Sequence, residues 1–354
     1  MYSESDIDAA VAAGAITPDA AASLRGHVAS LRGAPAVDEE QFRLLTGFND
    51  IFVSIACLLL LAAVAGIGGA IAAVLAPAAV AGTAWGLAEY FTRRRRMALP
   101  SIILLLAFVG GVAGTLGVAL ANDTIGNWIK SLSSDQNVQI GVAALLAALV
   151  AAATAGAAWL HWRRFMVPIT VAAGAVAVVG VAMALIVGLI PPARNAVLPL
   201  VLVSGVAMFA FAMRWDMSDR ERRTRRSDVA FWLHLAAAPM IAHALFNMLG
   251  VFRDQIGLVQ AVVVLALYMA FALVALAVDR RALLVSSLAY VLFALYTLFQ
   301  QAGALELSAA FTGLVIGSAL LLLSAFWHAA RRYVVALLGG VIAQRLPPVQ
   351  MLPA

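Results

Sequence analysis

Long apolar runs separated by short polar stretches dominate the chain from about residue 49 onward. Runs of about 20 apolar residues are what an α-helix needs to cross the hydrocarbon core of a bilayer. The pattern therefore predicts an all-α, polytopic membrane protein with about ten transmembrane helices arranged as hairpins. The expected spans are 49–65, 70–91, 98–120, 138–160, 166–189, 196–213, 229–249, 258–278, 283–300 and 309–328.

Three regions follow from the same pattern. Residues 1–46 are predicted to be a cytoplasmic helical hairpin and linker, 47–332 the transmembrane domain, and 333–354 a cytoplasmic tail. In the hairpin, Thr17 is a suitable N-cap and Pro18 a suitable first residue of the second helix. This region is too short to bury a sizeable core, so we expect it to lean on the membrane domain, a partner or a second copy.

Basic residues mark every second loop, which indicates the orientation of the spans. Loops expected in the cytoplasm carry arginines at 93–96, 163–164, 214–226, 280–281 and 331–332, whereas the loops between them carry only Lys130, Arg194 and Arg253. By the positive-inside rule both termini are cytoplasmic. The first two spans are joined by "GIGG" at 66–69, which we interpret as a tight turn, and 121–137 is the longest outer loop.

Composition agrees with a membrane protein, because 64% of the residues are hydrophobic and 12% are charged. The net charge of +5 is explained by the loop arginines, so we expect no nucleic-acid partner. The single cysteine, Cys57, excludes an intramolecular disulfide and a cysteine-based metal site. An arginine-rich, alanine-rich composition favours a bacterial inner (plasma) membrane. No GxxxxGK[ST] motif occurs, which argues against ATP-driven pumping by this chain.

Charged residues are absent from the middle of every predicted span. Asp50, Glu89, Asp216 and Asp279 all fall at predicted ends, and Glu89 is placed to pair with Arg93 four residues later. Because intramembrane carboxylates often mark ion pathways, their absence counts against a proton- or sodium-coupled transporter with a carboxylate at its centre.

The segment "FWLHLAAAPMIAHALFNML" (231–249) is the most unusual of the apolar runs. His243 and Asn247 lie four residues apart and share a helix face with Pro239, which should kink the helix and free the carbonyl of Leu235. His234 lies half a turn away, at about 100° per residue, and should point toward the cytoplasmic interface. The two histidines therefore cannot share a metal ion.

A polar pocket is predicted where this helix meets the ninth span. Its residues would be His243, Asn247, Tyr290, Tyr296 and Gln300. The alternative is that neutral His and Asn side chains hydrogen-bond to neighbouring helices and only hold the bundle together. No catalytic residue, metal site or cofactor is predicted.

Several weaker features support close helix packing and an interfacial aromatic belt. GxxxG occurs at Gly82–Gly86, Gly110–Gly114 and Gly313–Gly317, and we expect tight internal packing there. "RRRRMALPSII" (93–103) and "WRRFMVPITV" (162–171) suggest a duplicated hairpin, although every inward-facing loop needs arginine followed by apolar residues. His161 and His328 are expected at the cytoplasmic interface.

The stretch "GAITPDAA" (14–21), followed by "RLLTGFNDIFVSIACLLLLAAVAGI" (43–67), gives the chain a family resemblance. It resembles bacterial multi-pass inner-membrane proteins of uncharacterised function, in which a G-x-[IL]-T/S-P-x-x-A hairpin precedes a many-helix membrane domain. The resemblance covers about the first third of the chain. It implies no activity, and no functional residue is transferred from it.

Two functions remain open on these residues, with transport slightly favoured. The first is a transporter or permease-like protein with a small-molecule substrate. The second is a non-catalytic membrane scaffold or sensor that signals through the N-terminal hairpin and the arginine-rich loop 214–226. A polar cavity reaching the bilayer midplane would favour transport, and a tightly packed bundle would favour the sensor.

Other classes and partners follow from the same residues. A lipid-modifying enzyme would need the acidic residues of 216–228, but arginines interleave with them, so an enzyme is disfavoured. The expected partners are membrane lipids, together with a second copy or another protein bound through the N-terminal hairpin.

Overall fold

The computed structural model of the 354-residue chain describes residues 4–32, 48–220, 222, 224–250, 258–301 and 307–348, and the statements below concern these residues. Every element in them is a helix. The chain forms two compact units, one within residues 1–42 and a larger one within residues 43–349. The all-helical class predicted from the sequence is therefore confirmed.

The N-terminal unit is a pair of helices, α1 (Glu4–Ala12) and α2 (Pro18–Arg32). Gly14, with φ of +69°, turns the chain between them. The side-chain oxygen of Thr17 accepts a hydrogen bond of 3.1 Å from the amide of Ala20, as an N-cap does. Arg25 pairs with Asp8 at 2.6 Å and ties the two helices together. The predicted linker lies outside the described residues.

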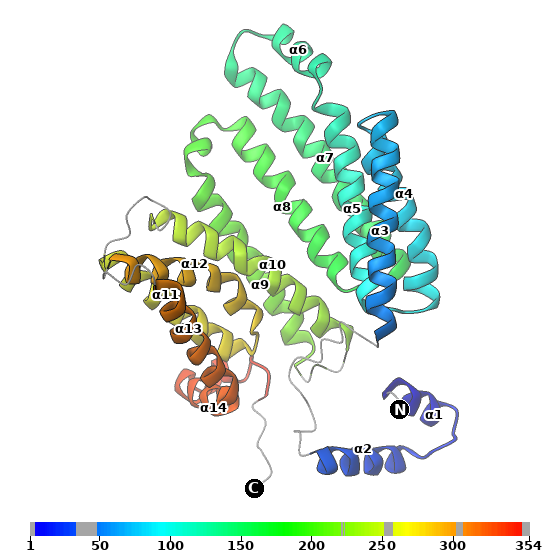
Figure 1. Ribbon diagram of the computed structural model, residues 1–354, viewed down its shortest axis with the longest axis vertical. Helices are drawn as coiled ribbons and strands as arrows, with labels where there is room; N and C mark the ends of the chain where they lie inside the picture. The colour runs from blue at the N-terminus through cyan, green and yellow to red at the C-terminus, as the bar shows by residue number, and fades with distance from the viewer. Residues whose placement is uncertain are drawn as a thin grey trace. The chain divides into compact units, whose positions relative to one another are not determined.

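The larger unit is a series of antiparallel helices, in which the two helices of each hairpin lie side by side (Figure 1). Its elements are α3 (Phe48–Ile71), α4 (Leu75–Ala88), η1 (Glu89–Arg94), α5 (Ala98–Leu120), α6 (Asp123–Leu132), α7 (Gln136–Phe165), α8 (Ile169–Leu189), η2 (Pro191–Ala196), α9 (Val197–Ser218), α10 (Arg225–Met248), α11 (Leu258–Val278), α12 (Ala282–Gln301), α13 (Ser308–Ala325), α14 (Trp327–Leu338) and α15 (Gly340–Ala343).

Within the described residues, seven helical segments are long and apolar enough to cross a membrane. They are α3, α5, α7, α8, the continuous segment Pro191–Ser218, α10 and α13. The chain is therefore a multi-pass helical membrane protein. Shorter apolar stretches occupy Val262–Val278 in α11 and Leu283–Tyr296 in α12. Every predicted span overlaps a helix, although the reversal at residues 72–74 falls inside the predicted span 70–91. The count of ten crossings remains a prediction.

Four hairpins reverse direction through the same backbone conformation. The connections between α4 and α5, α7 and α8, α9 and α10, and α11 and α12 each contain one non-glycine residue with positive φ. These residues are Arg96 (52°), Met166 (55°), Arg222 (53°) and Asp279 (61°). The left-handed region is uncommon for residues with a side chain. Its recurrence in these four connections indicates that the hairpins share one local design.

One loop prediction was wrong. The "GIGG" segment is helical, since α3 runs to Ile71, and the reversal falls at residues 72–74. Gly68 allows the reversal because a Cβ there would lie 2.7 Å from the carbonyl oxygen of Leu75. The outer loop 121–137 contains α6, which Asn122 caps through a hydrogen bond of 2.9 Å from the Ile125 amide. A helix with polar residues on one side only is typical of the membrane interface.

Of the six glycines in the predicted GxxxG motifs, only Gly114 makes a close helix contact, since a Cβ there would lie 3.0 Å from the Cβ of Pro77. A Cβ at Gly82, Gly86, Gly110, Gly313 or Gly317 would meet open space. Close approach occurs instead at Gly111, where a Cβ would lie 2.7 Å from the Pro77 carbonyl oxygen, and at Gly205, 2.8 Å from Ile241. Glycine spacing alone does not show which face of a helix meets its neighbour, which is why the prediction was wrong at five of the six glycines.

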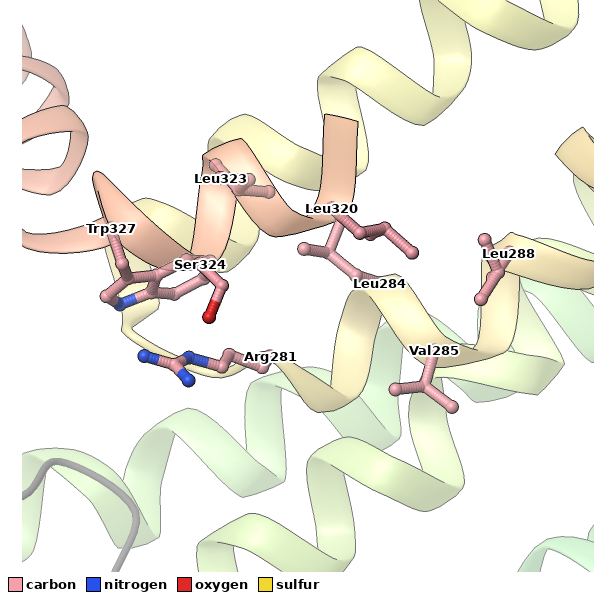
Figure 2. A pocket seen from close by; sticks show the side chains of 8 residues that line it. All are labelled: Arg281, Leu284, Val285, Leu288, Leu320, Leu323, Ser324 and Trp327. Atoms are coloured by element: carbon pink, nitrogen blue, oxygen red, sulfur yellow. The ribbon is translucent and has the colours of Figure 1, made fainter. Parts of the chain in front are cut away.

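Helix α13 ends at Ala325, and after Phe326 the chain continues as α14. Trp327, expected in an aromatic belt, is 1% exposed. A cavity of about 150 Å³ lies between α12 and the end of α13, beside Trp327 (Figure 2).

Candidate functional site

The structure brings together three of the five residues predicted to form a polar pocket. The Nδ1 atom of His243 on α10 lies 3.0 Å from the hydroxyl of Tyr290 on α12. The amide nitrogen of Asn247 lies 3.2 Å from Nε2 of His243 and donates to the His243 carbonyl at 3.0 Å. Tyr290 also stacks on Phe246, with ring centroids 4.5 Å apart. These contacts join α10 to α12.

These residues are not enclosed, because His243 is exposed and Asn247 is partly exposed. Ala242 and Phe246, which lie beside His243 around the helix, take the buried positions. Tyr296 is 38% exposed, and the side chain of Gln300 lies outside the described part of the chain. Helix α10 continues through Pro239 without interruption. The role of these residues as a pocket stays a prediction.

His234 occupies a different environment, half a turn away and fully buried. Its Nε2 atom lies 2.8 Å from a carboxylate oxygen of Asp216, near the end of α9. Asp216 also receives two hydrogen bonds from Arg280, at 2.5 Å and 3.3 Å. The same guanidinium donates to the carbonyl and hydroxyl oxygens of Ser227, at 3.1 Å and 3.2 Å. Residues from α9, α10 and the α11–α12 connection therefore meet at one buried carboxylate.

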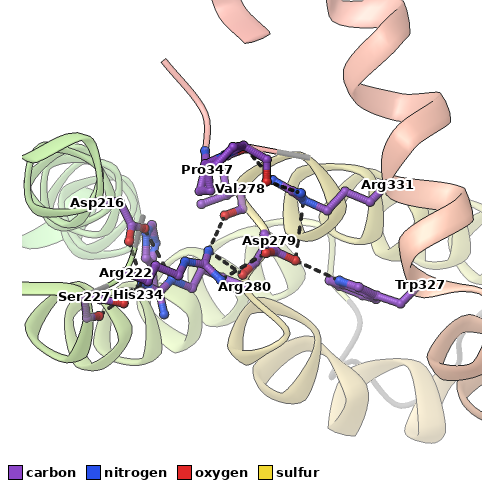
Figure 3. Close-up of polar contacts among 11 residues, drawn as sticks. Asp216, Arg222, Ser227, His234, Val278, Asp279, Arg280, Trp327, Arg331 and Pro347 are labelled. Carbon is purple, nitrogen blue, oxygen red and sulfur yellow. Dashed lines mark hydrogen bonds and ion pairs between the residues drawn. The ribbon is translucent and has the colours of Figure 1, made fainter. Parts of the chain in front are cut away.

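A second buried carboxylate, Asp279, lies next in sequence to Arg280 (Figure 3). Arg222 donates to it at 3.0 Å, and the indole N–H of Trp327 donates at 2.8 Å. The Nε atom of Arg331 on α14 lies 3.5 Å from the same carboxylate. Arg222 also donates to the carbonyls of Val278 and Asp279, at 3.2 Å and 2.9 Å. We call the residues around the two carboxylates the charge cluster; they are Asp216, Arg222, Ser227, His234, Asp279, Arg280, Trp327 and Arg331.

The charge cluster also holds the segment that follows α15. Arg331 donates to the carbonyls of Pro347 and Pro348, at 2.7 Å and 3.2 Å. Arg220, in the α9–α10 connection, donates to the carbonyl of Leu346 at 2.9 Å. Residues 346–348, predicted to lie in a cytoplasmic tail, are therefore bound back onto the helix ends.

Local sequence features place these side chains. Thr224 caps α10, with its hydroxyl 3.2 Å from the amide of Arg226. Asp219 accepts hydrogen bonds from the amide and hydroxyl of Thr224, at 2.8 Å and 2.7 Å. The positive φ of Arg222 and Asp279 turns the chain so that both side chains enter the cluster. Asp is one of the residues best suited to that backbone region.

Charge within the cluster is unevenly balanced, with three guanidinium groups around two carboxylates. Burial lowers the pKa of the Arg222 guanidinium below its ordinary value, and repulsion from Arg280 adds to this, while the Asp279 and Asp216 carboxylates oppose it. The two carboxylates therefore offset part of the effect of burial and of Arg280 on Arg222. A proton added to His234 would raise the positive excess further.

His234 is the one titratable group of the charge cluster that changes charge near neutral pH when unperturbed. A proton on Nε2 lets the neutral ring donate to Asp216. The other ring nitrogen, Nδ1, is buried and has no hydrogen-bond partner within the described residues. The ring edge packs against Phe209, with centroids 5.0 Å apart. The site can therefore accept a proton only by burying an additional unpaired N–H group.

Asp216 and Asp279 had been assigned to the membrane interface from their positions at predicted span ends. In the structure they are 2% and 4% exposed. The sequence contained a signal for these ion pairs, because both carboxylates fall at the same predicted membrane level as several arginines. His161, also expected at the interface, is fully buried, with its Nδ1 atom 3.3 Å from the Thr170 hydroxyl.

The pairing predicted between Glu89 and Arg93 is confirmed at 3.3 Å. Glu89 also binds Arg164 on α7, at 2.7 Å and 3.1 Å. These side chains are about a third to a half exposed, so this bridge is a surface contact and not a second buried cluster.

Over the described part of the chain, no three His, Cys, Asp or Glu side chains gather as metal ligands would. The chain has no match among protein-family models, curated proteins or solved structures. Function must therefore be argued from the site itself.

Proposed function

We propose that the protein is a membrane-embedded scaffold or sensor, and that the charge cluster couples its helices to the segments at one membrane face. The observation that carries this proposal is the way two buried carboxylates join α9, α10, the α11–α12 connection and α14. A change in any one of these elements alters the partners of the others. We further propose ten spans, both termini in the cytoplasm and a location in a bacterial inner membrane.

Buried charges favour coupling because they cannot be rearranged singly. Moving one partner leaves a desolvated charge behind, at a cost of about 3–5 kcal/mol. The helices around the charge cluster therefore tend to shift together or not at all, which is the behaviour that a two-state signalling element requires. Arg220, which binds the carbonyl of Leu346, is exposed, so we propose that another protein reads the state of the cluster at this residue.

Transport is the second candidate, and the repeated hairpin favours it. Many transporters are built from duplicated helix units, and four hairpins here share a left-handed connecting residue. A transporter must also expose a polar path at the bilayer midplane in one of its states. The described cavity does not provide one, since its lining is almost wholly apolar.

Cysteine accessibility separates the two functions. In a Cys57→Ala background, single cysteines replace Ala238, Ala242 and Ala294, which are at most 1% exposed and lie far from the helix ends. Native membranes are treated from each side with a membrane-impermeant thiol reagent. The sensor proposal expects no reaction at any position before unfolding. Reaction at any of them would show a water-filled path and would replace this proposal with transport.

Coupling across the charge cluster is tested directly with a reporter on α14. The reporter is Val335→Cys; Val335 is 8% exposed in the native protein. Asp216→Asn is expected to accelerate labelling of that cysteine about fivefold or more, the size of a typical coupling. Asp123→Asn on exposed α6 serves as the matched control. An unchanged labelling rate at position 335 would contradict coupling, and Ala84→Cys reports whether the whole fold has opened.

A further inference from the structure

We infer that the cavity between α12 and α13 binds an anionic phospholipid, with Arg281 holding the phosphate and the cavity holding part of an acyl chain. This inference goes beyond the proposed function and does not depend on it, since either a sensor or a transporter can carry a lipid site. It is argued from the lining of the cavity, its polarity from end to end, and its opening.

The lining of the cavity is mostly apolar, and its two polar side chains, Arg281 and Ser324, lie at one end. Figure 2 shows Arg281, Ser324 and Trp327 gathered at one end, with Leu288 at the other. Between them the lining consists of Leu284, Val285, Leu320 and Leu323. This order matches a phospholipid, which presents a charged headgroup followed by hydrocarbon.

The size suits a chain segment. From Arg281 to Leu288 is two turns of helix, or about 10 Å. An apolar cavity of similar volume in another protein stays dry and accepts a six-carbon ring. The volume of about 150 Å³ is therefore sufficient for part of an acyl chain but not for a whole lipid.

The opening faces the outside of the bundle, where lipid is available. Val285, on the rim, is 63% exposed, and the neighbouring Leu321 and Leu322 on α13 are 73% and 59% exposed. Apolar side chains exposed on a membrane-spanning helix face hydrocarbon. The remainder of the lipid can therefore stay in the bilayer while one chain enters the cavity.

Arg281 is placed at the level of the headgroups. It directly precedes α12, whose apolar stretch begins at Leu283, so it lies where the helix leaves the hydrocarbon. Its guanidinium carbon lies 4.9 Å from the centre of the Trp327 ring, which orients it toward the cavity end. Arginine binds phosphate through paired hydrogen bonds, and each basic residue near a membrane surface adds affinity for anionic lipid.

Trp327 links this cavity to the charge cluster. Its ring carries Arg281 on one face, while its N–H donates to Asp279 at 2.8 Å. A lipid phosphate that draws Arg281 away from the Trp327 ring would change the contacts of Trp327, which also donates a hydrogen bond to Asp279. The lipid site is therefore adjacent to the cluster without sharing its carboxylates.

The test uses native mass spectrometry of the full-length protein released from vesicles with equal parts phosphatidylglycerol and phosphatidylcholine. We expect retained phosphatidylglycerol to exceed phosphatidylcholine, and Arg281→Gln to lower the preference about fivefold. Leu320→Phe fills the cavity with all arginines in place and should also lower retention. Arg163→Gln is the matched control, because Arg163 stacks on Trp159 at 5.2 Å but does not line this cavity.

The outcomes are separable. Equal retention of the two lipids by the native protein would overturn the inference, as would an Arg281→Gln variant that retains lipid as the native protein does. Loss of retention in Arg163→Gln to the same degree would show general attraction to arginines and would also overturn it. Competition by soluble glycerol phosphate would assign the site to a free phosphate in place of a lipid.

Discussion

At the scale of single residues, burial decides the importance of the charge cluster. His234, Asp216 and Arg280 are each at most 2% exposed, whereas the predicted pocket residue His243 is exposed. A surface ion pair contributes little to stability, but removing one partner of a buried pair is costly. Asp216 is therefore the residue at which a small chemical change should have the largest effect.

Asp216→Asn keeps the shape of the side chain and removes its charge. We expect the free energy of unfolding to fall by about 3–5 kcal/mol, because Arg280 would remain buried without its carboxylate. Denaturation in mixed micelles, followed by circular dichroism, measures the change. Asp123→Asn, at an exposed position of α6, should cost less than about 1 kcal/mol. An equal loss of unfolding free energy in the two variants would show that the Asp216 contacts contribute no more to stability than the exposed Asp123 does.

At the scale of elements, close approach between helices depends on individual glycines. Gly110 and Gly111 are adjacent on α5, yet a Cβ at Gly110 meets open space and a Cβ at Gly111 meets the backbone of α4. The distances at Gly111 are 2.7 Å to the Pro77 carbonyl oxygen and 2.9 Å to the Ala81 amide. Backbone atoms cannot move aside as a flexible side chain can.

This pair of residues gives a matched experiment. Gly111→Ala should destabilise the protein by about 1–3 kcal/mol, since α4 and α5 would be forced apart. Gly110→Ala should be neutral or stabilise by about 0.5–1 kcal/mol, because alanine is the better helix former. The same micelle denaturation compares the two. A destabilisation of similar size at both positions would contradict the packing assigned to α4 and α5.

At the scale of the whole molecule, the alternation of basic loops predicts the orientation in the membrane. In a Cys57→Ala background, Ser131→Cys should react with an impermeant maleimide on intact cells, because the loop pattern predicts that it lies in an outer segment. Arg226→Cys should react only after permeabilisation. Both residues are exposed in the structure, so access differs by membrane side alone. Labelling of position 226 in intact cells would reverse the predicted topology.

The sequence alone was sufficient for the membrane class, for helices at all ten predicted spans and for the N-cap at Thr17. These are local properties, because the length of an apolar run and the residue before a helix can be read without knowing its neighbours. The reversal after α3 was misplaced, since a glycine-rich segment can form a turn or a close helix contact with equal ease.

The charge cluster was decided by tertiary structure. Its contacts join residues that are 18 to 64 positions apart in the chain. Asp216 with His234 is the shortest of these separations, and Asp216 with Arg280 is the longest. The sequence placed all of these residues near one membrane face, but which helix ends meet there depends on how the hairpins pack. Packing also decided that Asp216 and Asp279 turn inward to buried arginines, because a carboxylate at a helix end can equally face water when no partner is opposite it.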